Sequence, residues 1–113
     1  MQSITVADRQ GRLLNSRQYD WYGRLVDETV GVPETGVECR TSYDKQGNVN
    51  FLIVTRAVHS PNAEPTQQLV YRIDYEKDGS RQIAYYDPKG RLTRWTSVKN
   101  GIEAVLEEKH YPD

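Results

Sequence analysis

Hydrophobic and polar residues alternate along most of this chain with a period of two. The clearest case is "LVYRIDYE" at 69–76, whose apolar residues fall on one side and whose charged residues fall on the other. The stretch "VECRTSY" at 37–43 alternates in the same way. This period is typical of β-strands that have one solvated face. The pattern therefore predicts a chain built from strands.

One segment departs from this alternation. "FLIVTRAV" at 51–58 begins with residues that are apolar on both sides, so we expect the most buried strand there. The approximate ranges of the nine predicted strands are 3–7, 12–19, 24–30, 37–43, 48–58, 69–76, 80–86, 91–98 and 102–109. The last segment also fits a helix, because Asn100 and Glu103 have the spacing of a helix start. Strand and helix both stay open for 102–109.

Short polar clusters that end in glycine separate the predicted strands. They read "DRQG", "DWYG", "DKQG", "EKDG", "DPKG" and "VKNG", and they end at Gly11, Gly23, Gly47, Gly79, Gly90 and Gly101. An Asp at the first position of a type I turn accepts hydrogen bonds from the backbone that follows it. A Gly at the fourth position adopts the left-handed conformation that closes a three-residue hairpin loop with a bulge. We therefore expect tight hairpins at all six places.

Hairpins in series predict an all-β fold, an antiparallel meander of about nine strands. We expect it to curl into a small barrel or a wrapped sheet, because a flat meander leaves two long edges exposed. Two connections are not tight turns: a Pro/Gly loop at 31–36 and a polar loop at 59–68, "HSPNAEPTQQ". The second exceeds the usual hairpin loop, so it is either disordered or used for contact.

Three of the turns share a longer motif. "YDWYGRL" at 19–25, "YDKQGNV" at 43–49 and "YDPKGRL" at 86–92 resemble the YD repeat of the RHS family, and "DYEKDGSRQI" reads as a degraded fourth copy. The resemblance implies a hairpin-repeat β architecture and favours a bacterial protein. Members of that family build long β-sheet shells that enclose toxins. This chain has too few and too irregularly spaced copies to build such a shell.

Length, composition and charge narrow the possible partners. The 113 residues suit one domain, spanning 1–113, with a single modest core, since 36% are hydrophobic and 27% are charged. A net charge of −1 without a basic block argues against nucleic acid. No apolar run approaches the roughly 20 residues of a membrane helix, and no secretory signal is visible. We expect a cytoplasmic protein that does not insert into membranes.

The residue types that carry chemistry are sparse and scattered. His59, His110 and the single cysteine, Cys39, have no metal-ligand spacing. Cys39 alternates with apolar residues, so we interpret it as a core side chain. Neighbouring carboxylates at 27–28 and 107–108 point to opposite faces of a strand. We therefore expect no catalytic residues, no metal and no cofactor, and we expect that the protein is not an enzyme.

A second possibility is a small-ligand carrier. A closed meander can hold one ligand in its mouth, and Tyr71, Tyr75, Tyr85 and Trp95 are the residues that would line such a cavity. The alternative is that these rings fill the core, because the chain has few aliphatic residues. Both readings stay open at this point.

The turn at 20–23 raises the strongest functional question, because its two middle positions are Trp21 and Tyr22. Either this tip folds back over the end of the sheet as a plug, or it docks into a partner, as Trp, Tyr and Arg commonly do. The residues predicted to bind a partner are Tyr19, Trp21, Tyr22, Arg24, His59 and Asn62. We expect a non-enzymatic protein-binding module, either a small accessory or assembly subunit or a bacterial immunity protein. A lipocalin-like carrier is the alternative.

Overall fold

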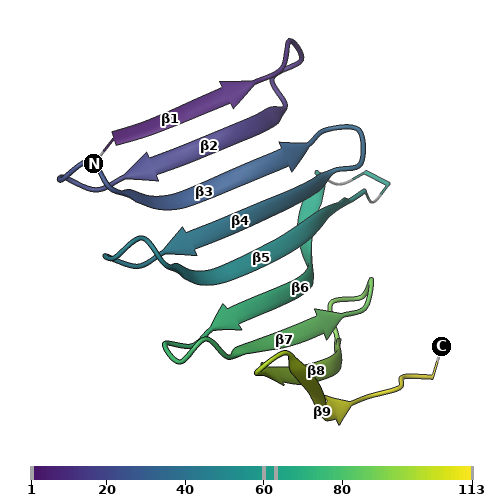
Figure 1. The fold of residues 1–113 in the computed structure, drawn as a ribbon. Coiled ribbons are helices and arrows are strands. Elements are labelled where there is room, and N and C mark those ends of the chain that lie inside the picture. The colour runs from purple at the N-terminus through teal and green to yellow at the C-terminus, as the bar shows by residue number, and fades with distance from the viewer. Residues whose placement is uncertain (1, 60, 63, 113) are drawn as a thin grey trace.

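The computed structural model describes residues 2–59, 61–62 and 64–112, which form nine β-strands and no helix. The strands are β1 (Gln2–Ala7), β2 (Leu13–Tyr19), β3 (Leu25–Val32), β4 (Val37–Tyr43), β5 (Val49–Val58), β6 (Thr66–Tyr75), β7 (Arg81–Tyr86), β8 (Leu92–Lys99) and β9 (Ile102–Glu108). Each pairs antiparallel with the next, so their order in the sheet is their order in the sequence (Figure 1). The predicted all-β meander is confirmed, and the segment expected at 102–109 is a strand over 102–108 and not a helix.

The Asp-x-x-Gly turns form as predicted, and the turn between β7 and β8 shows how. The Oδ1 atom of Asp87 accepts hydrogen bonds from the backbone N–H groups of Lys89 and Arg91, both at 2.9 Å. Its Oδ2 atom accepts one from Nε of Arg91 at 2.8 Å. The N–H of Gly90 donates to the Asp87 carbonyl at 2.9 Å, and this glycine has φ of +81°. A three-residue loop with a left-handed glycine is the geometry that such hairpins require.

The same carboxylate network recurs in the turns that begin at Asp8 and Asp20, and at Asp44 with Asn48 in place of the arginine. The turn that ends at Gly101 differs from the predicted three-residue loop. Lys99 pairs directly with Ile102, so the last turn has only two central residues. These are Asn100 and Gly101, with φ of 51° and 75°, as a type I′ hairpin requires. The three-residue loop expected at Gly101 is therefore wrong, because Asn-Gly itself favours the shorter turn.

The turn carboxylates predict how stability depends on pH. The pKa values of Asp8, Asp20 and Asp87 lie below the ordinary value, chiefly because each carboxylate accepts a hydrogen bond from the backbone N–H of the arginine four residues later. A depressed pKa stabilises the fold above the unfolded-state value of about 3.9, and this contribution is lost as the pH falls through the lower folded-state value. We therefore expect the free energy of unfolding to decline below about pH 4.

Urea titrations between about pH 4 and pH 2 measure this decline. The triple variant D8N/D20N/D87N cannot titrate at these positions and should show a shallower decline than the wild type. An equally steep decline in the variant would show that the turn carboxylates do not carry the effect.

The sheet is a single open layer. Throughout the described chain, each strand contacts only the strands next to it in sequence, and the molecule measures 44 × 40 × 18 Å. Figure 1 shows the sheet twisting from β1 to β9, with the last strands turned away from the plane of the first. The outer sides of β1 and β9 pair with no other described strand. Of the two predicted forms, the wrapped sheet is confirmed and the closed barrel is wrong.

The register places most of the large apolar side chains on one side of the sheet, called here the apolar face. Two rows of direct cross-strand partners define it, Leu52–Ile73–Ile83–Thr96 and Val54–Tyr71–Tyr85. Val54, Ile83 and Thr96 are buried, while most other strand residues are half-buried or exposed. The segment expected to form the most buried strand, 51–58, has one buried residue, Val54. Within the described chain no second layer covers the sheet, so the residues that are apolar on both sides of this strand stay largely half-buried.

The long polar loop is shorter than predicted. β6 begins at Thr66, and residues 66–68 pair with the end of β5, so the connection covers 59–65 and not 59–68. The hydroxyl of Thr55 donates to Oε1 of Gln67 at 2.9 Å across this extension. The antiparallel pairing of β5 and β6 therefore extends into the polar segment that was assigned to the loop. The remaining short connection, after β3, is a turn in which the N–H of Gly36 donates to the carbonyl of Val32 at 2.9 Å.

Candidate functional site

The aromatic tip is the turn between β2 and β3, defined here as residues 20–24. Asp20 holds it, since Oδ1 accepts from the N–H groups of Tyr22 at 2.9 Å and Arg24 at 3.0 Å. Oδ2 accepts from Nε of Arg24 at 2.8 Å. The N–H of Gly23 donates to the Asp20 carbonyl at 3.1 Å, and Gly23 has φ of +80°. The backbone that carries the two aromatic residues is therefore tied at both ends of the turn.

Both aromatic side chains of the tip point into solvent. Trp21 is 87% exposed and Tyr22 is 84% exposed, whereas Trp95 on β8 is 37% exposed. A plug over the end of the sheet would bury these rings, so the plug reading is wrong. Exposing an aromatic ring of about 200 Å² forgoes several kcal/mol of burial at roughly 25 cal/mol per Å². The same backbone frame carries no aromatic residue in the other Asp-led turns, so the frame itself does not require the aromatic pair.

Arg24 links the tip to its neighbours. Its guanidinium carbon lies 5.0 Å from the centre of the Tyr22 ring, within range of a cation–π contact. Its Nη1 atom donates to the carbonyl of Lys45 at 3.4 Å, in the turn between β4 and β5. These two turns lie on the same side of the sheet, where β2 and β4 end (Figure 1). Tyr19, at the end of β2, is half-buried and pairs with Leu25. Tyr19 therefore lies at the base of the tip, and Trp21 and Tyr22 form its exposed end.

The other residues predicted to bind a partner lie elsewhere. His59 and Asn62 belong to the connection between β5 and β6, and both are exposed. In a meander, successive connections alternate between the two ends of the strands. The connection after β2 and the connection after β5 therefore lie at opposite ends of the strands, as Figure 1 shows. The six residues predicted to bind a partner therefore do not form one surface, and a site that combines them is wrong. Counting strands between the two segments was the signal that would have shown this.

The four residues proposed to line a ligand cavity do not converge. Tyr71 and Tyr85 are direct partners on the apolar face, with ring centres 6.2 Å apart, and Tyr75 alternates onto the same face. Trp95 pairs with Ala84 and lies on the opposite face. The open sheet also gives these rings no enclosed interior within the described chain. The bulge between β7 and β8 decides the face of Trp95, because it shifts the register between Tyr85 and Tyr86.

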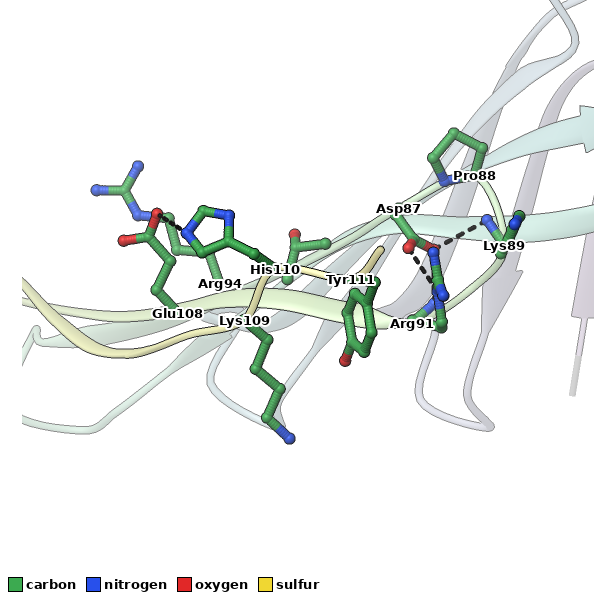
Figure 2. Close-up of a pocket in the computed structure, with 10 residues that line it drawn as sticks. Asp87, Pro88, Lys89, Arg91, Arg94, Glu108, Lys109, His110 and Tyr111 are labelled. Atoms are coloured by element: carbon green, nitrogen blue, oxygen red, sulfur yellow. Dashed lines mark hydrogen bonds and ion pairs between the residues drawn. The ribbon is translucent and has the colours of Figure 1, made fainter. Parts of the chain in front are cut away.

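One surface hollow was not predicted. It has a volume of about 620 Å³ and lies between the turn of β7–β8 and the tail that follows β9 (Figure 2). The hydroxyl of Tyr111 donates to the carbonyl of Leu92 at 2.7 Å, and the Arg91 guanidinium carbon lies 4.2 Å from the centre of the Tyr111 ring. The carboxylate of Glu108 pairs with His110 at 3.3 Å. The two contacts of Tyr111 hold the tail against the start of β8, and the hollow lies beside this attachment.

The described residues contain no group of three or more His, Cys, Asp or Glu side chains that could hold a metal ion. Cys39 is half-buried and pairs with Val30 and Val54 on the apolar face. Burial raises the pKa of its thiol, which disfavours the thiolate that a nucleophile needs. Within the same residues, no helix is long and apolar enough to span a membrane.

Comparison with known proteins adds little to this geometry. No family model matches the chain, so its resemblance to YD repeats stays a prediction. No curated protein matches it either. Among solved structures, the chain is similar to a protein of unknown function from Bacteroides fragilis NCTC 9343, with 12% sequence identity over 98% of this chain and 93% of that chain and a TM-score of 0.30. Values this low support no argument about fold or function.

Proposed function

We propose that this protein is a non-enzymatic protein-binding module whose aromatic tip anchors the partner. The observation that carries the proposal is the exposure of Trp21 and Tyr22, 87% and 84%, on a turn whose backbone is held by Asp20. Large aromatic side chains contribute most to binding when they enter a pocket of the partner. A tip that is already ordered loses less conformational entropy on binding than a mobile loop does.

The partner that suits this tip is a protein with an apolar pocket large enough for an indole ring. The hydroxyl of Tyr22, whose ring is exposed, would meet polar groups at the rim of that pocket. Such a surface is compatible with a small accessory or assembly subunit, or with a bacterial immunity protein. A small-ligand carrier has less support, because the described sheet does not close into a barrel and Trp95 lies on the face opposite to Tyr71 and Tyr85.

Site-specific photo-crosslinking tests this proposal and identifies the partner. A benzophenone amino acid is placed at position 22 in one variant and at position 46 in a second, and each is expressed in the cells that make the protein. Position 46 is the matched control, because Gln46 occupies the equivalent place in the turn between β4 and β5. We expect a defined crosslinked protein from position 22 that is absent from position 46. The same products from both positions, or no product from position 22, would contradict the proposal.

A further inference from the structure

The two edges of the sheet differ in how they are protected. An edge strand presents unpaired backbone N–H and C=O groups, which natural proteins guard with charged residues, prolines or bulges. β9 carries three glutamates, Glu103, Glu107 and Glu108, and a register shift where it pairs with β8. β1, with the sequence QSITVA, carries neither a charged residue nor a proline, and its register shift, between Val6 and Ala7, lies at the end of the strand. Only β9 has charged side chains along an outer strand.

The side chains of β1 are also unusual for an outer strand. All six residues are exposed, and Ile4 and Val6 are 47% and 50% exposed. Both lie on the apolar face. The row of cross-strand partners that begins at Ile4 leads to Leu52, and the row that begins at Val6 leads to Val54. This edge therefore offers hydrogen-bonding backbone and β-branched side chains together. β-branched residues are the type that stabilises cross-strand pairs.

We propose that two copies of this chain pair through β1, antiparallel and related by a two-fold axis, to form one continuous sheet. An axis centred on Thr5 places Ile4 opposite Val6 of the second copy, and Val6 opposite Ile4 of the second copy. Both pairs then lie on the apolar face, and Thr5 meets its own copy on the other face. The strand is complementary to itself in this register without any charged pair.

Charge and symmetry select this arrangement over its competitors. Pairing of two β9 strands would bring glutamates of both copies together, and like charges across a strand pair destabilise it. Pairing of β1 with β9 of another copy is head-to-tail and produces an open filament, whereas the β1–β1 contact closes at two copies. Strands of six residues bury little surface, so the dimer is expected to be weak and to depend on concentration. The aromatic tip takes no part in this contact, so the dimer does not depend on the proposed function.

Sedimentation velocity over a wide concentration range tests the dimer with two matched variants. Ile4 and Val105 are each 47% exposed, both lie on the apolar face, and they occupy the two edge strands β1 and β9. We expect the wild type and Val105→Lys to dimerise as the concentration rises, and Ile4→Lys to remain a monomer. A monomeric wild type, loss of the dimer in Val105→Lys, or a persistent dimer in Ile4→Lys would each overturn the proposal.

Disulfide trapping decides the register, and it also decides the question if Ile4→Lys fails to fold. In a Cys39→Ala background, Thr5→Cys places two thiols directly opposite each other across the axis, while Ser3→Cys places them four residues apart along the pair. We expect a covalent dimer to form at least ten-fold faster from Thr5→Cys than from Ser3→Cys under mild oxidation. Equal rates would show that the copies meet only by random collision and would overturn the proposal.

Discussion

Replacing Trp21 with Lys and Tyr22 with Gln is expected to weaken partner binding by about 30-fold or more, which corresponds to roughly 2 kcal/mol for a hot-spot aromatic residue. The double variant copies the Lys45–Gln46 pair of the turn between β4 and β5. Because both rings are exposed, their removal takes from the folded protein only the surface contact between Arg24 and the Tyr22 ring. The melting temperature should therefore stay the same or rise slightly.

The measurement is calorimetric titration with the protein that crosslinks to position 22, alongside thermal melting of each variant. Lys45→Ala/Gln46→Ala is the matched control and should bind as the wild type does. Tyr22→Phe separates the ring from its hydroxyl, and we expect it to keep most of the affinity. A stable Trp21→Lys/Tyr22→Gln variant with unchanged affinity would eliminate the aromatic tip as the binding site.

The second large effect concerns stability. Gly36→Ala is expected to lower the free energy of unfolding by about 2–5 kcal/mol, which combines a left-handed backbone penalty of about 1–2 kcal/mol with overpacking of about 1–3 kcal/mol. Gly36 has φ of +71°, and a Cβ atom there would lie 2.8 Å from Cβ of Ala57. The N–H of Ala57 donates to the carbonyl of Gly36 at 2.8 Å, so the two backbones cannot separate without losing this bond.

Gly47→Ala is the matched control, because Gly47 also has a positive φ, +85°, but a Cβ atom there meets nothing within 4 Å. It should cost about 1 kcal/mol, from the backbone penalty alone. In the Ala57→Gly background the clash at Gly36 disappears, so Gly36→Ala should then cost about as much as Gly47→Ala. Urea unfolding of the four variants measures these differences. Equal losses for Gly36→Ala and Gly47→Ala in the wild-type background would show that the contact with Ala57 is relieved at no cost.

The strands and most turns could be predicted from the sequence because both depend on interactions between residues close together in the chain. The period of two reflects the alternation of side chains along one strand, and Asp87 binds backbone groups only two and four residues away. Tight turns also determine that strands which follow each other in the sequence pair in the sheet. The Trp21–Tyr22 tip was identified for the same reason, since two aromatic residues in a polar frame are visible without any knowledge of distant contacts.

The failures arose where an outcome depends on segments far apart in the chain or on a displaced register. His59 lies far from the tip because successive connections of a meander alternate between the two ends of the strands. Trp95 lies on the face opposite to Tyr71 and Tyr85 because a bulge shifts the register between β7 and β8. Whether β1 meets β9 is determined by the accumulated twist of nine strands, which no local pattern contains. By itself, the sequence determined the meander, its hairpins and the unusual tip. Only the tertiary structure decided that the sheet stays open, because closure and burial depend on the twist and stacking of the whole sheet.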